Sequence, residues 1–270
     1  MRERITITIK QEILDQVDRM VDGLNVRSRS QAFEFLLSKV LTDVKLKTCL
    51  ILAGGEKNKI MIDRKPKFLQ EIKGKELLIH SMDAIHKHHV GRFLVYVDNF
   101  GEEIAQKLSQ KQLQYNLEFI QGKTSSGTIE PLQLAKDKLN DTFLLAYGDT
   151  ISNVNIQEML QFHREQKAIA TIALTTVSNP KDYGVAILQG NKVKAFIQKP
   201  SKDLGSYIIS TGYFLFEPEV FKYLSRNDTS LEKDLLPRLA EKGLLNGYTF
   251  QGLYLNINSK KDLERAEILL

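Results

Sequence analysis

The chain opens with a strict alternation of polar and apolar residues. Within residues 4–9 every second position is isoleucine, and a period of two places these isoleucines on one face of an extended segment. The opposite face carries Arg4, Thr6 and Thr8. The pattern predicts a strand that is buried on one face only.

Two helical patterns follow this segment. Apolar residues recur at intervals of three and four within 13–24, and Gly23 is placed to end the helix. A second stripe of the same spacing covers residues 32–41, with Ser28 as the expected N-cap. One strand and two helices in about 43 residues bury too little surface to close a core, and a lone strand has unpaired edges. We therefore expect residues 1–44 to form an intertwined homodimer, or a higher even-numbered oligomer.

In the order strand, helix, capped helix, this domain resembles the ribbon-helix-helix family of DNA-binding proteins. The resemblance implies that the paired strands enter the major groove of double-stranded DNA. It also implies that the start of the second helix contacts a phosphate. The residues implied in base contacts are Arg4, Thr6 and Thr8, and those implied at the phosphate are Arg27, Ser28 and Arg29.

Two other interpretations of this segment stay open. Residues 4–9 would serve equally as the first strand of a larger sheet, with the threonines on its solvated face. Alternatively, the domain mediates dimerisation or partner binding without contacting DNA. The complete order of strand and two helices, with base-reading residue types on the strand, favours the DNA-binding interpretation over both.

From residue 48 onward, strand patterns alternate with helical ones. An apolar run at 48–53 ends in two glycines, and a helical stretch follows at 77–86. Further strands are expected at 93–97, 117–120, 143–146 and 169–174. This alternation predicts an α/β domain over residues 48–270, with a mostly parallel sheet flanked by helices. Ligands of such domains lie at the carboxyl ends of the strands.

Composition and charge narrow the class of protein. Hydrophobic residues make up 42% of the chain and charged residues 26%, which excludes a disordered chain. The net charge of +5 is thinly spread, so any contact with nucleic acid must come from a local patch. The single cysteine excludes an intramolecular disulfide, and neither a signal peptide nor a membrane span is apparent. We expect a cytoplasmic protein with no membrane partner.

A series of short motifs runs through the larger domain in a fixed order. They are Gly54-Gly55, Pro66-Lys67, Gln121, Gly127-Thr128, Tyr147-Gly148-Asp149, Tyr183-Gly184, Gln198-Lys199-Pro200, Thr211-Gly212 and Tyr254-Leu255-Asn256. In this order and spacing the chain resembles the sugar-phosphate nucleotidylyltransferases from about residue 48 to its end. The resemblance implies a Rossmann-like fold of the glycosyltransferase-A type.

That family joins a nucleoside triphosphate to a sugar 1-phosphate and releases pyrophosphate, with Mg²⁺ held by two aspartates. The resemblance implies that the larger domain binds a nucleotide, a sugar nucleotide or a sugar phosphate. The implied nucleotide-binding residues are Gly54, Gly55, Lys67, Gln121, Gly127 and Thr128, and the implied sugar-binding residues are Gly184, Lys199 and Thr211. If the domain is active, Lys67 and Asp149 are catalytic and Asp149 is also a metal ligand.

Several family positions are altered in this chain. The phosphate loop A-G-G-x-G-T-R of the family reads here Ala53-Gly54-Gly55-Glu56-Lys57-Asn58-Lys59. Asn256 stands in place of the second metal aspartate, and Gln198 in place of a glutamate. Together these two changes remove two negative charges from a site that gathers Mg²⁺ and triphosphate, and one aspartate alone is a poor magnesium site.

The intact ribbon pattern beside an altered catalytic loop leads to one main hypothesis, a dimeric DNA-binding transcriptional regulator whose larger domain senses a nucleotide or sugar ligand. The alternative is an active sugar-1-phosphate nucleotidylyltransferase that carries a DNA-binding domain. A third interpretation is an assembly protein held together by the ribbon, and a fourth treats the pocket as vestigial. Outside the motifs, His163 is expected at the surface of a helix, without an acidic partner.

Overall fold

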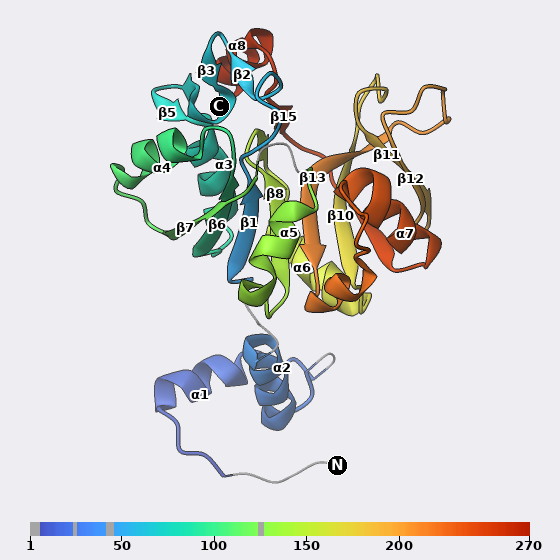
Figure 1. The fold of residues 1–270 in the computed structure, drawn as a ribbon. Helices are drawn as coiled ribbons and strands as arrows, with labels where there is room; N and C mark the ends of the chain where they lie inside the picture. Colours follow the sequence, from blue (N-terminus) through green and yellow to red (C-terminus); the bar gives the residue numbers. More distant parts are fainter. Residues whose placement is uncertain (1–5, 24–25, 42–45, 124–126) are drawn as a thin grey trace. The chain divides into compact units, whose positions relative to one another are not determined.

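The computed structural model describes residues 6–23, 26–41, 46–123 and 127–270, and it divides into two compact units, Met1–Lys45 and Leu46–Leu270 (Figure 1). The first unit contains α1 (Gln11–Asp18) and α2 (Arg29–Leu41). Val17 and Ala32 are buried, and the side chain of Ser28 accepts a hydrogen bond from the backbone of Gln31 at 3.2 Å. Ser28 is therefore the N-cap that the sequence predicts.

The predicted strand over residues 4–9 is not observed in the described part of this segment. Residues 6–9 lie outside every strand and helix, and Arg4 lies outside the described residues. Ile7 is 53% exposed, although the alternation predicts it on a buried face. A strand needs a neighbour for its ladder of hydrogen bonds, and no other described segment pairs with residues 6–9. The first helix also ends earlier than predicted, at Asp18 instead of Gly23.

The second unit is built on a nine-stranded sheet of order β10-β14-β12-β11-β13-β8-β1-β6-β7. Its strands are β1 (Thr48–Leu52), β6 (Arg92–Val97), β7 (Asn116–Gln121), β8 (Phe143–Tyr147), β10 (Ala170–Thr176), β11 (Gly184–Gln189), β12 (Lys192–Gln198), β13 (Ile208–Phe216) and β14 (Leu245–Thr249). The four strands β7, β6, β1 and β8 run parallel, whereas β13 pairs antiparallel with β8 and with β10. The sheet is therefore mixed and not mostly parallel, because β13 and the β11–β12 hairpin extend the parallel half with antiparallel pairs.

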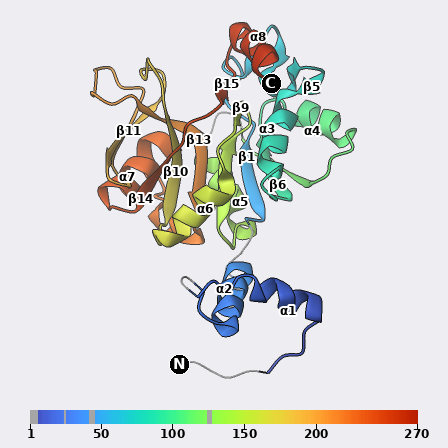
Figure 2. The same ribbon diagram turned by 180° about the vertical axis from the view of Figure 1, so that it is seen from behind.

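Helices cover both faces of this sheet (Figures 1 and 2). On one face α3 (Leu77–His86), α4 (Gly101–Ser109) and α6 (Ile156–Glu165) contribute to one hydrophobic cluster, and on the other α5 (Glu130–Ala135) and α7 (Leu236–Glu241) contribute to a second. Successive residues of β1 belong alternately to the two clusters. Cys49 and Ile51 belong to the first cluster, Leu50 and Leu52 to the second. A strand buried on both faces reads as an unbroken apolar run.

Short elements complete the unit beside the main sheet. They are the hairpins β2 (Met61–Ile62) with β3 (Lys65–Pro66) and β4 (Glu71–Ile72) with β5 (Lys75–Glu76), the pair β9 (Thr150–Ser152) with β15 (Tyr254–Asn256), the 3₁₀ turns Lys67–Leu69, Lys136–Lys138 and Pro218–Tyr223, the π-helical turn Leu231–Leu235, and α8 (Lys260–Leu269). None of the helices in the described part of the chain is long and apolar enough to cross a membrane.

Candidate functional site

Asp149 lies where β8 ends, at the carboxyl edge of the parallel strands. The turn that carries it is tight, because the backbone N–H of Gly148 donates to the carbonyl of Leu52 on the neighbouring strand at 2.9 Å. After this turn the chain enters β9, which pairs antiparallel with β15, so that Asn256 lies opposite Thr150. Two segments about a hundred residues apart thus meet at one strand end, as parallel-sheet topology predicts.

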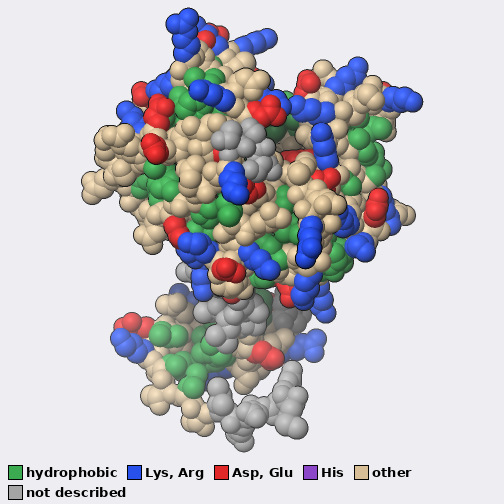
Figure 3. Space-filling view, viewed as in Figure 1, with side chains coloured by type: hydrophobic (Ala, Val, Ile, Leu, Met, Phe, Trp, Pro, Cys, Tyr) green, Lys and Arg blue, Asp and Glu red, His purple; other side chains and the backbone are tan. Residues whose placement is uncertain are grey.

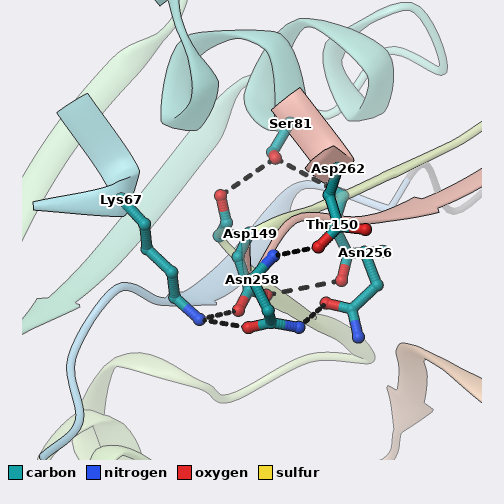
Figure 4. A network of polar contacts seen from close by, with 8 residues as sticks. Lys67, Ser81, Asp149, Thr150, Asn256, Asn258 and Asp262 are labelled. Carbon is teal, nitrogen blue, oxygen red and sulfur yellow. Dashed lines mark hydrogen bonds and ion pairs between the residues drawn. The ribbon is translucent and has the colours of Figure 1, made fainter. Parts of the chain in front are cut away.

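The side chains at this strand end form a hydrogen-bonded cluster (Figure 4). The Lys67 ammonium forms an ion pair with the Asp149 carboxylate and donates to the side-chain carbonyl of Asn258 at 2.8 Å. The amide of Asn258 in turn donates to the side-chain carbonyl of Asn256 at 3.0 Å. Lys67 is 7% exposed and Asp149 16%, so solvent screens this ion pair only weakly. The structure therefore brings together Lys67, Asp149 and Asn256, as the sequence motifs predict.

Two further side chains hold the cluster in place. The hydroxyl of Ser81, buried on α3, lies 3.0 Å from the carbonyl of Gly148 and 2.8 Å from that of Thr150, on either side of Asp149. The Asp262 carboxylate at the start of α8 accepts from the backbone N–H of Asn258 at 3.1 Å. The positions of Asp149 and Asn258 therefore depend on helices that precede and follow them in the chain.

A cavity of about 670 Å³ opens in front of the cluster. Figure 3 shows the surface hollowed between the lobe that carries α8 and the lobe that carries β11 and β12. Its lining residues include Asn58, Lys59, Asp149, Asp182, Tyr183, Gly184, Gln198, Lys199, Thr211, Glu232, Tyr254, Asn256, Asn258 and Asp262. The lining is mostly polar and carries both lysines and carboxylates, which suits a ligand with a phosphate and hydroxyl groups.

The three predicted sugar-binding residues all line this cavity, but in different ways. Position 184 has no room for a side chain, because a Cβ on Gly184 would lie 2.3 Å from the ring of Phe196. Lys199 is exposed and lies next to Gln198, whose side-chain carbonyl is buried without a hydrogen-bond partner among the described residues. Thr211 is fully buried, and its hydroxyl donates to the carbonyl of Ala173 at 3.0 Å, so its role in the structure is to join two strands.

The predicted glycine turn after β1 is held by a carboxylate that the sequence motifs do not include. The backbone N–H of Gly55 donates to the side chain of Asp98, at the end of β6, at 2.7 Å. A Cβ on Gly54 would lie 2.7 Å from the ring of Tyr96 and 2.8 Å from Cγ of Asp98. Burial raises the pKa of Asp98, although hydrogen bonds from Asn99 and Gly55 oppose the shift. Gly54 is therefore required for the close packing of this turn against the end of β6.

The two lysines of the altered phosphate loop interact with residues other than Asp149. The ammonium of Lys59 forms an ion pair with Glu56 at 2.7 Å, and that of Lys57 lies 5.7 Å from the centre of the Phe100 ring. Both partners of the first pair are more than half exposed, which makes it a weak pair that a phosphate can displace. Lys59 nevertheless lines the cavity, so its charge remains available to an anionic ligand.

None of the six predicted nucleotide-binding residues, Lys67 included, is among the residues that line this cavity. Gln121 donates its side-chain N–H to the carbonyl of Asp98 at 3.1 Å. A Cβ on Gly127 would lie 2.1 Å from the carbonyl oxygen of Thr229. The hydroxyl of Thr128 donates to the carboxylate of Glu232 at 2.9 Å. These three residues thus make contacts within the domain. Their direct contact with a base stays a prediction.

Glu232 connects this region to the strand that carries Asp149. Its carboxylate accepts hydrogen bonds from the hydroxyls of Tyr147, Thr128 and Ser230. Burial raises the pKa of Glu232 and outweighs the hydrogen bonds that lower it. Because Tyr147 is the last residue of β8, a carboxylate on the π-helical turn is linked to the strand end at which the cluster lies.

The donor set at Asp149 does not fit a two-carboxylate magnesium site. Mg²⁺ prefers charged oxygen ligands in an octahedral arrangement. Here Asp149 is already paired with an ammonium, and Asn256 and Asn258 offer only neutral amide carbonyls. The carbonyl of Asn256 accepts from the side-chain N–H of Asn258, and that of Asn258 accepts from Lys67. Among the residues that the structure describes, no group of three or more His, Cys, Asp or Glu side chains is arranged to hold a metal.

The residues predicted to contact DNA lie in the first unit, where the structure accounts for some of them. Thr6 and Thr8 are exposed, and Arg4 lies outside the described residues. The guanidinium of Arg29 forms two hydrogen bonds of 2.6 Å with the carboxylate of Asp18. This pairing lowers the pKa of Asp18 and raises that of Arg29. A phosphate at the start of α2 would have to compete with Asp18 for this side chain.

A model of the nucleotidyl transferase family matches residues 48–262, most of the chain. The chain belongs to the nucleotidyl transferase family. The mannose-1-phosphate guanylyltransferase catalytic subunit beta of Danio rerio is 29% identical to it over 222 residues, which are 79% of this chain and 61% of that protein. The same subunit of Dictyostelium discoideum is 28% identical over 221 residues, with the same coverage of both chains. The chain thus spans about three fifths of the length of these relatives.

Solved structures share the fold of this nucleotidyl transferase domain. HddC from Yersinia pseudotuberculosis matches with a TM-score of 0.72 and 19% identity, over 83% of this chain and 99% of that one. The inositol-1-phosphate CTP transferase from T. maritima matches with a TM-score of 0.71 and 18% identity, over 83% and 95% of the two chains. The α/β nucleotidyltransferase-like fold predicted from the motifs is confirmed.

Three residues at the site of this nucleotidyl transferase domain escaped sequence reasoning. Asp98 directly follows the predicted strand 93–97, so the rule that ligands lie at strand ends would have found it. Asn258 lies two residues beyond Asn256, which marks it as a neighbour but not as a partner of Lys67. Glu232 lies on a π-helical turn with no local signal, and only the tertiary structure brings it to Tyr147.

Proposed function

We propose that the second unit is a sugar-1-phosphate nucleotidyltransferase, which forms a sugar nucleotide and pyrophosphate from a nucleoside triphosphate and a sugar 1-phosphate. The observation that carries the proposal is the ion pair of Lys67 and Asp149 at the end of β8. Asp149 lines a polar cavity together with Gly184, Gln198 and Lys199. Membership of the nucleotidyl transferase family supports it. This interpretation is favoured over the regulator that we put first from the sequence.

The chemistry requires charge compensation more than covalent catalysis. A phosphate oxygen of the sugar 1-phosphate attacks the α-phosphorus of the triphosphate, and a new P–O bond forms as the bond to the bridging oxygen of the β-phosphate breaks. Pyrophosphate leaves with that electron pair. We assign Lys67 to the charge that develops on the phosphates, and Lys199 to the phosphate of the sugar substrate. Gln198 offers a buried carbonyl that a sugar hydroxyl would satisfy.

A pyrophosphate-release screen tests the proposal. The purified chain is incubated with each of the four common nucleoside triphosphates and a panel of sugar 1-phosphates, with Mg²⁺ and separately in EDTA. GTP with mannose 1-phosphate is the first pair, because curated relatives are named mannose-1-phosphate guanylyltransferases. We expect pyrophosphate and a sugar nucleotide in equal amounts from at least one pair.

Matched variants separate catalysis from contamination. Lys67→Gln removes the ammonium of the cluster and should abolish pyrophosphate release, whereas Lys65→Gln, two residues earlier on β3 and paired with Glu71, should leave it unchanged. Activity that is equal in both variants comes from another protein in the preparation. Silence of the wild-type chain across the whole panel would contradict the proposal.

A second candidate function, for the first unit, is dimerisation and DNA binding of the ribbon-helix-helix type. The observation in its favour is the apolar surface of this unit, on which Ile7, Ile13 and Leu37 are each more than two fifths exposed (Figure 3). A second copy that pairs its residues 4–9 with those of the first would cover such a surface and supply the missing strand. Thr6 and Thr8 would then face outward, toward a major groove.

The mass of the full chain in solution and a footprinting experiment test this second function. A dimer that Ile7→Lys converts to a monomer would support the pairing, and Thr6→Ala should weaken protection of a preferred DNA sequence. Lys10→Ala, just beyond the segment, serves as a control for a general loss of positive charge. A monomeric wild-type chain, or protection without any sequence preference, would contradict this function.

A further inference from the structure

The cluster at the end of β8 contains an ammonium group that is almost completely buried. The Lys67 side chain is 7% exposed, and its ammonium lies between the carboxylate of Asp149 and the carbonyl of Asn258 (Figure 4). A buried ammonium is tolerated where such acceptors replace its hydration. The carboxylate at the strand end is thus already neutralised by a side chain, at the place where the family holds a metal ion.

The side-chain amide of Asn258 forms hydrogen bonds with both Lys67 and Asn256. Its carbonyl accepts from Lys67 at 2.8 Å, and its N–H donates to the carbonyl of Asn256 at 3.0 Å. The Asn256 oxygen is the one that would replace a metal-binding carboxylate, and it is partly occupied by this hydrogen bond. The backbone of Asn258 is itself fixed, because its N–H donates to Asp262.

We propose that Lys67, positioned by Asn258, takes the place of the divalent metal as the cation of this site. The Lys67 ammonium balances the Asp149 carboxylate, and Asn256 and Asn258 are neutral. The nearby carboxylate of Asp262 accepts hydrogen bonds from the backbone N–H of Asn258 and the hydroxyl of Ser259, so the two carboxylates beside this cavity edge already have partners. A metal at Asp149 would also have to displace the Lys67 ammonium from that carboxylate. In this proposal the Lys67 ammonium, and not a metal ion, is the cation that a polyphosphate contacts. The identity of this ligand rests on the proposed function.

Binding of Mn²⁺ to the ligand-free full chain, followed by electron paramagnetic resonance, tests the cation assignment by itself. We expect no saturable binding that depends on Asp149 up to about 1 mM, well beyond the range of a dedicated metal site. One Mn²⁺ per wild-type chain, lost in Asp149→Asn, would overturn the proposal.

Two double variants test the same expectation by a gain of Mn²⁺ binding. Asn256→Asp combined with Lys67→Gln supplies a second carboxylate and removes the competing ammonium. Asn256→Asp combined with Lys65→Gln removes instead a lysine two residues earlier in the chain, whose ammonium pairs with Glu71. The first variant should bind Mn²⁺ at least about ten-fold more tightly than the second, because only it removes the charge at the site. Equal affinities would show that Lys67 does not exclude the metal.

Inorganic pyrophosphate is a probe that needs no knowledge of the base or the sugar. By calorimetry its affinity for the wild-type chain should differ by less than about three-fold between EDTA and Mg²⁺. Asn258→Ala should weaken binding in EDTA about ten-fold, the usual effect of losing a hydrogen bond to a charged group. A fall of more than about ten-fold for the wild type in EDTA would overturn the proposal.

These measurements also separate this inference from the proposed function. Failure of pyrophosphate to bind in either buffer counts against a nucleotidyltransferase, whereas the Mn²⁺ titration decides the role of Lys67 in either case. Circular dichroism and urea unfolding of each variant show that the chain is folded, so that a change in binding reports on the site.

Discussion

The hydroxyl of Tyr147 donates a hydrogen bond to the carboxylate of Glu232, a residue 85 positions further along the chain. Glu232 also accepts from Thr128 and Ser230, so one half-buried carboxylate joins the end of β8, the turn before α5 and the π-helical turn. Asp149 lies two residues beyond Tyr147. We infer that Glu232 is a positioning residue, which fixes the end of β8 relative to the turn that carries Thr128.

Substitution of Glu232 should therefore affect turnover more than substrate binding. Glu232→Gln keeps an acceptor for Tyr147 and should retain most of the activity, whereas Glu232→Ala leaves three donors unpaired and should lower kcat about ten-fold or more. Steady-state kinetics of pyrophosphate release check this expectation. A rise in KM with unchanged kcat would show that Glu232 contributes to binding instead of to positioning.

The same carboxylate predicts a specific dependence of stability on pH. Burial raises the pKa of Glu232 above its ordinary value of 4.5, so the folded chain keeps this proton where the unfolded chain loses it. The free energy of unfolding therefore falls as the pH rises from about 4.5 through the higher pKa of the folded state. Glu232→Gln does not titrate. Urea unfolding should show the variant gaining stability relative to the wild type as the pH rises above about 4.5.

Close packing at Gly54 predicts a cost for the smallest possible substitution. A Cβ at this position would lie 2.7 Å from the ring of Tyr96 and 2.8 Å from Cγ of Asp98, both on β6 or at its end. Gly54→Ala should lower the free energy of unfolding by about 1 to 3 kcal/mol, the usual range for overpacking. Gly91→Ala is the matched control, because no atom lies within 4 Å of its added Cβ. Equal stability of the two variants in urea would contradict this account.

The sequence predicted the features that depend on local patterns, and it missed those that depend on contacts between residues far apart in the chain. Helix α3 has the predicted bounds, 77–86, and β1, β6, β7, β8 and β10 match the predicted strands to within a residue or two, because their apolar runs are local signals. The mixed sheet was not predicted, since strand direction depends on distant pairings such as that of β13 with β8. At the site, Lys67, Asp149 and Asn256 were predicted from motifs, whereas Asn258 and Glu232 act through tertiary contacts that leave no pattern in the sequence.

The prediction that His163 on α6 lies at the surface was wrong, again because its partners lie outside its own helix. His163 is fully buried, with its ring nitrogens 2.7 Å from the hydroxyl of Thr171 and 3.1 Å from the carboxylate of Glu217. Its local sequence is polar, and only the packing of α6 on the sheet reveals the partners. His163→Ala should lower the free energy of unfolding by about 2 to 4 kcal/mol, since it leaves a cavity and two unpaired polar groups.

Glu217 provides a pH-dependent test of this buried contact. Burial raises the pKa of Glu217, but hydrogen bonds from His163 and Thr142 outweigh it, and the net pKa lies below 4.5. The contribution of this carboxylate to stability is therefore complete above about pH 4.5 and is lost as the pH falls through the lower pKa of the folded state. Glu217→Gln should flatten the acid side of the stability profile in urea. An unchanged acid limb would mean that the contact contributes nothing in solution.

The ion pair between Asp18 and Arg29 allows a sharp test of DNA binding by the first unit. Arg29 was predicted to contact a phosphate, but both of its hydrogen bonds to Asp18 are 2.6 Å long. Asp18→Asn keeps the size of the side chain and releases the guanidinium from its charged partner. If α2 approaches DNA, the variant should bind more tightly in a mobility-shift assay, and its affinity should fall more steeply with salt, by about 0.9 in the logarithmic slope for one added phosphate contact. The second unit expressed alone, residues 46–270, should show no such gain from any added charge. An identical slope for the Asp18→Asn and wild-type chains would place Arg29 away from the nucleic acid.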